Sequence, residues 1–63
     1  MADFAVYNTT TKEILMVVTD AANPNDSAWN PSGSSRITID RTTYNMLYPN
    51  IKAILAYISG LLG

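Results

Sequence analysis

The chain has 63 residues and contains neither cysteine nor histidine. This composition excludes disulfide bonds, and it excludes the zinc sites that small domains build from thiolate and imidazole. Four cations and five acids give a net charge of -1, and the cations are scattered along the chain. The clustered basic surface that nucleic-acid phosphates require is therefore excluded. A chain of this size buries only about 60% of its unfolded surface, so we expect it to gain stability from a protein partner.

The first third of the chain predicts a β-hairpin. Phe4–Tyr7 and Ile14–Thr19 are rich in β-branched and aromatic residues. The polar segment Asn8–Lys12 between them is typical of a short turn. We therefore expect two antiparallel strands.

The second of these strands is apolar on both faces. Strict alternation places Ile14, Met16 and Val18 on one face and Leu15 and Val17 on the other. A strand of this kind is usually covered on both sides. The domain's own helix can cover one face, and we expect a neighbour to cover the other.

A third strand and a short helix are predicted next. Arg36–Asp40 alternates, with Ile37 and Ile39 on one face, as a half-buried or edge strand does. Asp40 can then cap the exposed N–H groups of a short helix over Arg41–Leu47.

The end of the chain predicts a second helix. The short helix should stop at Tyr48, because a residue before proline is disfavoured in the α conformation. Pro49 suits the first position of the next helix. Apolar residues then recur at helical spacing; they are Ile51, Ile54, Leu55, Ile58, Leu61 and Leu62. The run is too short for the roughly 20 residues that span a bilayer, so we expect a helix packed on the sheet and no membrane span.

Together these elements predict a single small α+β domain over residues 1–63. Its three-stranded antiparallel sheet consists of the hairpin, a long irregular loop at 20–35 and the third strand. The C-terminal helix packs against this sheet, and the short helix comes before Pro49.

The loop holds the only groups that suggest chemistry. Asp20, Asn23, Asn25 and Asp26 offer oxygen ligands, but their spacing lacks the pattern of a calcium-binding loop. Serine and threonine have no histidine to activate them as nucleophiles. Because Asp and Asn are common in loops as turn formers, we expect no catalytic residue, metal site, cofactor or small-molecule substrate.

Trp29, the single tryptophan, has three interpretations. Stacking on a sugar ring or a base is one of them, and the missing basic patch counts against it. The other two concern protein surfaces. It either folds back onto the sheet of its own chain or anchors a partner, as tryptophan often does at interfaces. The candidate partner-binding residues are Trp29, Asn23, Asn25, Asn30, Leu15 and Val17.

The segment FAVYNTTTKEILMVVTD, residues 4–20, resembles the first hairpin of many small proteins encoded by tailed bacteriophages. In those hairpins a strand ending in Asp or Asn precedes a turn of the Thr-Gly-Glu-Ile type and an aliphatic strand. Thr11, Glu13 and Ile14 match this pattern, and Lys12 stands where glycine is commonest. The resemblance covers about a quarter of the chain and implies a virion component or an assembly-associated protein.

We therefore expect a non-enzymatic structural protein of a bacteriophage virion, associated with the capsid or tail. It would bind copies of itself or a larger phage structural protein. One alternative is a small phage-encoded regulatory binder that inhibits a host protein, and another is a membrane-active protein that acts through Ile51–Leu62. An acid near the N-terminus, with no apolar run after it, predicts the virion or the host cytoplasm and no export by a signal peptide.

Overall fold

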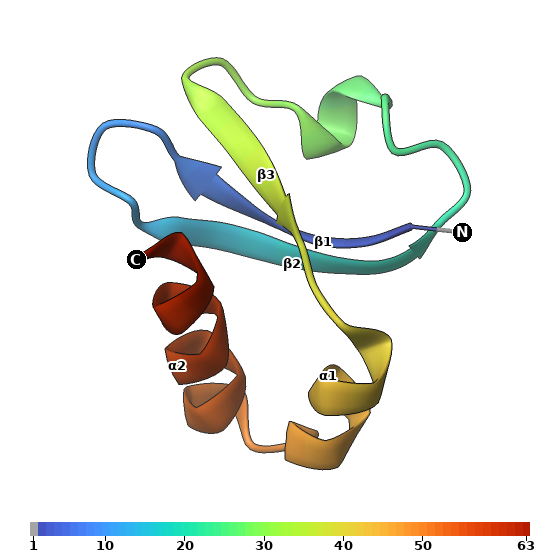
Figure 1. The fold of residues 1–63 in the computed structure, drawn as a ribbon. Coiled ribbons are helices and arrows are strands. Elements are labelled where there is room, and N and C mark those ends of the chain that lie inside the picture. The colour runs from blue at the N-terminus through green and yellow to red at the C-terminus, as the bar shows by residue number, and fades with distance from the viewer. Residues whose placement is uncertain (1) are drawn as a thin grey trace.

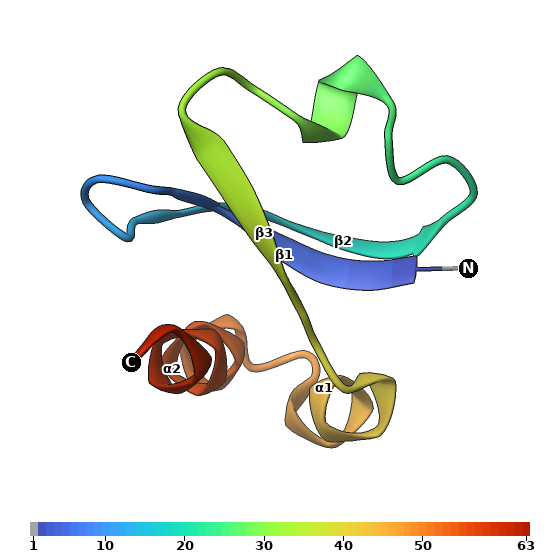
Figure 2. The same cartoon turned by 45° about the horizontal axis from the view of Figure 1, so that its top comes forward.

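A computed structural model describes residues 2–63, which form a three-stranded antiparallel sheet followed by two helices. The predicted α+β fold is thereby confirmed. Figures 1 and 2 show both helices on one face of the sheet and the long loop on the other. The elements are β1 (Ala2–Asn8), β2 (Ile14–Ala21), the 3-10 turn η1 (Ser27–Trp29), β3 (Ser34–Thr38), α1 (Arg41–Leu47) and α2 (Ile51–Leu62).

β1 lies in the middle of the sheet, because the strand order is β2-β1-β3. It pairs antiparallel with both neighbours, so that Ala5 faces Val17 on one side and Ile37 on the other. The centre of β1 is accordingly the most buried part of the sheet, with Phe4 only 2% exposed and Val6 fully buried.

The sheet separates two apolar clusters. The helix-side cluster consists of Ala5, Ile39, Ile54 and Ile58. The loop-side cluster consists of Phe4, Val6, Val18 and Ala21, with Trp29 packed against it. The two faces of β2 are thus covered by the helices and by the loop of the same chain. The loop of the same chain therefore supplies the cover that the sequence pattern led us to expect from a neighbour.

β2 contains a bulge that changes which side chains share a face. The pairs Val6–Met16 and Tyr7–Ile14 leave Leu15 as an extra residue on β2. Ile14 consequently packs against the helix-side cluster, whereas Met16 packs against the loop-side cluster. The predicted grouping of these two side chains on one face is wrong, because the bulge interrupts the alternation.

The hairpin turn is held by the side chain of Asn8. Its Oδ1 accepts from the N–H groups of Thr10 at 2.8 Å and Thr11 at 2.9 Å, and its carbonyl accepts from the N–H of Lys12 at 2.8 Å. Lys12 has a φ of 65°, the left-handed conformation that glycine adopts most readily. The turn at Asn8–Lys12 is therefore confirmed.

The third strand and α1 follow the prediction closely. β3 begins two residues before the predicted Arg36 and ends at Thr38, and α1 has the predicted bounds. Asp40 caps α1, because its Oδ2 accepts from the backbone N–H of Thr43 at 3.3 Å and from the Thr43 hydroxyl at 2.7 Å. The hydrogen bonds from Thr43 lower the pKa of Asp40 below its ordinary value.

The start of α2 differs from the prediction, because the helix is capped by Asn50 and does not begin at Pro49. Tyr48 ends α1 in an extended conformation, as its place before proline predicts. Pro49 lies outside α2, however, so its predicted position in the first helical turn is wrong. Asn50 is the N-cap instead, and its Oδ1 accepts from the N–H of Ala53 at 3.2 Å.

The apolar stripe of α2 is narrower than predicted. Ile54 and Ile58 are buried against the sheet, but Ile51 is 59% exposed and Leu61 is 42% exposed. A single helix lying on a small sheet can bury only its central row of side chains. Within residues 2–63, the helices lack the length and hydrophobicity needed to cross a membrane.

Candidate functional site

The loop between β2 and β3 is shorter and more ordered than predicted. β2 continues to Ala21 and β3 starts at Ser34, so the connection spans 22–33 rather than 20–35. It contains η1, whose first turn is capped by the Asp26 side chain accepting from the N–H of Ala28 at 2.9 Å. The loop is therefore a structured layer on the sheet.

Asn30 holds this layer together. Its Nδ2 donates to the carbonyl of Pro24 at 3.1 Å and to that of Asp26 at 2.7 Å. Its Oδ1 accepts from Nη2 of Arg36, whose guanidinium also lies 4.5 Å from the centre of the Phe4 ring. Both polar atoms of the Asn30 side chain are engaged inside the chain, so this side chain shapes the loop.

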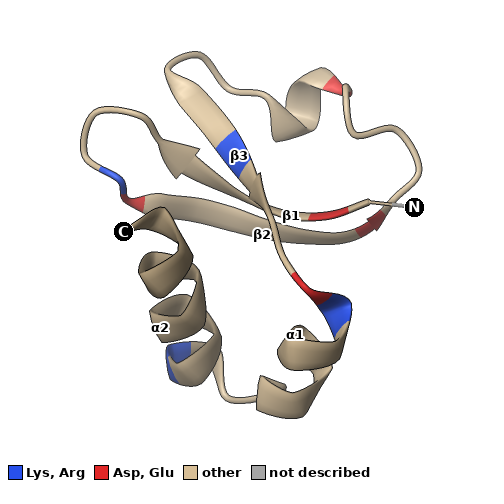
Figure 3. Cartoon of the chain, viewed as in Figure 1, with Lys and Arg blue, Asp and Glu red and all other residues tan. Residues whose placement is uncertain are grey.

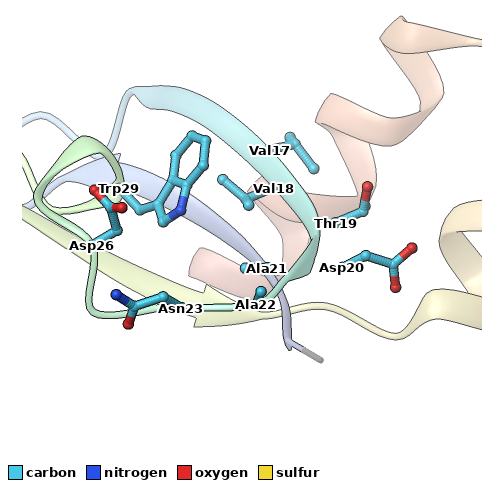
Figure 4. Close-up of a pocket in the computed structure, with 9 residues that line it drawn as sticks. All are labelled: Val17, Val18, Thr19, Asp20, Ala21, Ala22, Asn23, Asp26 and Trp29. Atoms are coloured by element: carbon cyan, nitrogen blue, oxygen red, sulfur yellow. The ribbon is translucent and has the colours of Figure 1, made fainter.

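A pocket of about 510 Å³ lies between the end of β2 and the loop. Figure 4 shows the indole of Trp29 and the side chain of Val18 beside one another in it, while the Asp20 carboxylate points away. The lining residues are Val17, Val18, Thr19, Asp20, Ala21, Ala22, Asn23, Asp26 and Trp29. The pocket thus combines an aromatic wall with the C-terminal half of β2.

Three of the four side chains considered as calcium ligands, those of Asp20, Asn23 and Asp26, accept hydrogen bonds within the chain. Both carboxylate oxygens of Asp20 accept from Arg41, at 2.7 and 3.1 Å. Asn23 Oδ1 accepts from the N–H of Asn25 at 3.3 Å, and Asp26 caps η1. These three side chains therefore hold the structure of the chain itself. Among residues 2–63, histidine, cysteine and acidic side chains form no group of three that could hold a metal ion.

The hydrogen-bonding direction of β1 can be read from its two ends. The carbonyl of Asp3 accepts from the N–H of Ile39, on the β3 side, at 3.2 Å. The N–H of Asn8 donates to the carbonyl of Glu13, on the β2 side, at 2.8 Å. Because backbone groups alternate sides along a strand, odd-numbered residues of β1 bond toward β3 and even-numbered residues bond toward β2.

It follows that part of β2 has free hydrogen-bonding groups. Met16 and Val18 stand opposite even-numbered residues of β1 and therefore bond to it. Val17, which lies between them, directs its N–H and C=O groups outward. Thr19 follows Val18 and continues the alternation outward, at the start of a second register shift that lies between the pairs Phe4–Val18 and Ala2–Ala21. Since β2 is an edge strand, these groups lie along the open edge of the sheet. We call Met16–Thr19 the β2 edge.

The structure brings only some of the candidate residues together. Trp29, Asn23 and Val17 line the pocket. Leu15 is 44% exposed at the bulge, while Asn25 is exposed in the loop and, like Leu15 and Asn30, does not line the pocket.

Thr19 is the candidate residue that the sequence pattern did not indicate. The prediction weighed side chains, whereas the open N–H and C=O of Thr19 depend on the register between β1 and β2. The continuous β-branched run of β2 was the available signal, because an apolar strand ending in a long loop can lie at a sheet edge.

Models of known protein families, curated proteins and solved structures were compared with this chain, and no match was found in any of the three comparisons.

Proposed function

We propose that this chain is a non-enzymatic interaction protein that binds a protein partner along the β2 edge. We further propose that it serves as a capsid- or tail-associated component of a bacteriophage virion. The observation that carries the first proposal is the row of outward N–H and C=O groups on Val17 and Thr19, directly beside the pocket of Trp29.

This arrangement suits the addition of a partner strand. In strand addition, main-chain hydrogen bonds supply affinity and a pocket beside the edge accepts side chains of the added strand. Edge strands that avoid such pairing usually carry charges or proline. The β2 edge, with the sequence Met-Val-Val-Thr, carries neither.

The rest of the surface also favours a partner. Several large apolar side chains are exposed in residues 2–63 while the charged residues are few. The exposed ones are Leu15, Met46, Tyr48, Ile51, Leu55 and Leu61. A protein that occupies a place in a larger assembly can cover such side chains.

The phage assignment is supported by the hairpin. In the resembling hairpins, glycine is commonest where this chain has Lys12. Lys12 adopts the left-handed conformation that glycine favours, so the backbone of the turn is compatible with that pattern.

Amide hydrogen exchange tests the binding surface. The N–H groups of Val17 and Thr19 should exchange rapidly in dilute isolated protein, and they should become protected in the complex that co-purifies with it. Arg36 and Thr38, whose N–H groups point outward from β3 by the same alternation, are the matched controls. Protection at β3 alone, or at neither edge, would reject the β2 edge as the binding surface.

The identity of the co-purifying proteins tests the assembly role. Capsid or tail proteins are the expected result. A host enzyme bound at the same edge would instead identify a regulatory binder and overturn the virion assignment.

A further inference from the structure

We infer that a second pocket, beside β3, binds a carboxylate through the guanidinium of Arg36. The pocket has a volume of about 400 Å³, and residues of β1, β3 and the loop contribute to its lining. It shares no lining residue with the Trp29 pocket. The inference therefore stands or falls independently of the proposed function.

Arg36 is a half-buried cation without an acidic partner. It is the single charged residue of β3, and Figure 3 shows a cation and no acid on this strand. Among residues 2–63, the ion pairs are those of Arg41, with Asp20 at 2.7 Å and with Asp3 at 3.7 Å. A cation that is partly removed from water loses hydration, and an opposite charge compensates for this loss. An anion in the pocket would supply that charge.

The guanidinium is held in place while most of its donors stay free. Its Cζ lies 4.5 Å from the centre of the Phe4 ring, and its Nη2 donates to Oδ1 of Asn30. These two contacts fix the plane of the group without neutralising its charge. The fork of N–H donors on a guanidinium matches the two oxygens of a carboxylate. Because the group is already ordered, binding costs less conformational freedom.

The rest of the lining suits a carboxylate on a short aliphatic stem. Thr38 is exposed at the pocket and can donate its hydroxyl to an anion, whereas Ala2 and Pro24 offer apolar surface to a stem. Asp3 also lines the pocket, but its carboxylate accepts from the N–H of Asp20 at 2.9 Å and is paired with Arg41. The one unpaired cation of the pocket balances the single charge of a carboxylate.

The two lysines do not offer a comparable site. Lys12 and Lys52 are both exposed, so water hydrates their ammonium groups. An ammonium also acts as a point charge and lacks the planar fork that matches a carboxylate. The inference is therefore specific to Arg36, and Lys52 provides a matched control.

Titration with sodium propionate, followed by NMR of the backbone amides and arginine side chains, tests the site. Propionate carries the carboxylate and the short stem of a glutamate side chain. The Nε–H signal of Arg36 should shift with a dissociation constant of about 10 mM. The Nε–H signal of Arg41 should stay in place, because its guanidinium is already paired with acids.

Two control solutes separate a carboxylate site from a general effect of ions. Propionamide has the same shape without the charge, and it should cause no shift at Arg36. Sodium chloride at the same ionic strength should cause a much smaller shift than propionate. Equal shifts with chloride and propionate, or equal shifts at Arg36 and Arg41, would overturn the site.

Substitutions then test the role of the guanidinium. Arg36→Gln and Lys52→Gln each remove one positive charge, but only Arg36→Gln should abolish propionate binding. Arg36→Lys keeps the charge without the fork and should bind about tenfold more weakly. Equal affinities of Arg36→Gln and Lys52→Gln would contradict the role of Arg36. Circular dichroism establishes that the variants are folded.

A further variant keeps the test decisive if Arg36→Gln does not fold. Thr38→Val has a similar shape at an exposed position of β3 and lacks only the hydroxyl donor. It should weaken propionate binding about threefold. An unchanged affinity would count against the pocket as the binding site.

A blocked tripeptide distinguishes the two sources of the carboxylate. The peptide has glutamate at its centre, and its control has glutamine there. Binding of the glutamate peptide about tenfold more tightly than propionate would identify an acidic side chain of a protein as the ligand. Binding no tighter than that of propionate would identify a free small acid. A glutamine peptide that binds as well as the glutamate peptide would overturn the recognition of a carboxylate.

Discussion

Replacement of Trp29 by alanine tests the most consequential contact of the loop. The indole packs on the loop-side cluster and is partly exposed. A tryptophan in such a position removes roughly 150 Å² from water, which at about 25 cal/mol per Å² corresponds to nearly 4 kcal/mol. The loss is smaller than this, because the alanine side chain still buries part of the area and the unfolded chain already buries some of it. We therefore expect the free energy of unfolding to fall by about 2 to 3 kcal/mol.

This loss is large for so small a protein. At about 0.05 to 0.15 kcal/mol per residue, a chain of 63 residues has a total stability of roughly 3 to 9 kcal/mol. Trp29→Ala should therefore leave the protein folded near room temperature only if its stability lies in the upper part of that range. Urea unfolding followed by circular dichroism measures the change without relying on the tryptophan signal.

Trp29→Phe is the matched control, because it keeps an aromatic ring over the loop-side cluster and should lose about half as much stability. A loss below about 0.5 kcal/mol for Trp29→Ala, the usual range for exposed positions, would refute the packing of the loop on its own sheet. Tryptophan emission of the wild type gives an independent check. A spectrum identical to that of free tryptophan would contradict the packing as well.

Three further predictions address the helices and their caps. Ile58→Ala should lower the free energy of unfolding, measured in urea, by about 3 kcal/mol. Ile51→Ala, at a position 59% exposed, should lower it by less than about 0.5 kcal/mol. Equal losses would contradict the packing of α2. Asn50→Ala should lower the free energy of unfolding by about 1 kcal/mol. Asn50→Asp should change it little, because aspartate can still accept the capping hydrogen bond. Equal effects of the two variants would argue against a cap. The hydrogen bonds from Thr43 hold the pKa of Asp40 low, so its carboxylate stabilises the fold above the unfolded pKa and loses this effect as the pH falls through the folded pKa. The stability advantage of wild type over Asp40→Asn should therefore shrink below about pH 4, and an advantage independent of pH would contradict this role.

The proposed role in a larger assembly does not require any single contact to be strong. Single contacts of low affinity become effective when several act together, because each one raises the local concentration for the next. The exposed apolar side chains on α1, α2 and their connection offer further contact area beyond the β2 edge.

The sequence by itself determined the elements that depend on neighbouring residues. The turn at Asn8–Lys12, the bounds of α1, its cap at Asp40 and the stop at Tyr48 all follow from interactions within about four residues. Hydrogen bonds and steric clashes over such short separations are the same in almost any fold. The residue types alone were therefore sufficient to predict them.

Only the tertiary structure decided which surfaces are covered and which remain open. The bulge at Leu15 reverses the expected side of Ile14, and the outward groups of Thr19 depend on the register with β1. Trp29 reaches the sheet because the loop bends back over it, and the hydrogen bonds of the Asn30 side chain hold that bend. These outcomes depend on strands and loops far apart in the sequence, whose relative positions no local pattern encodes.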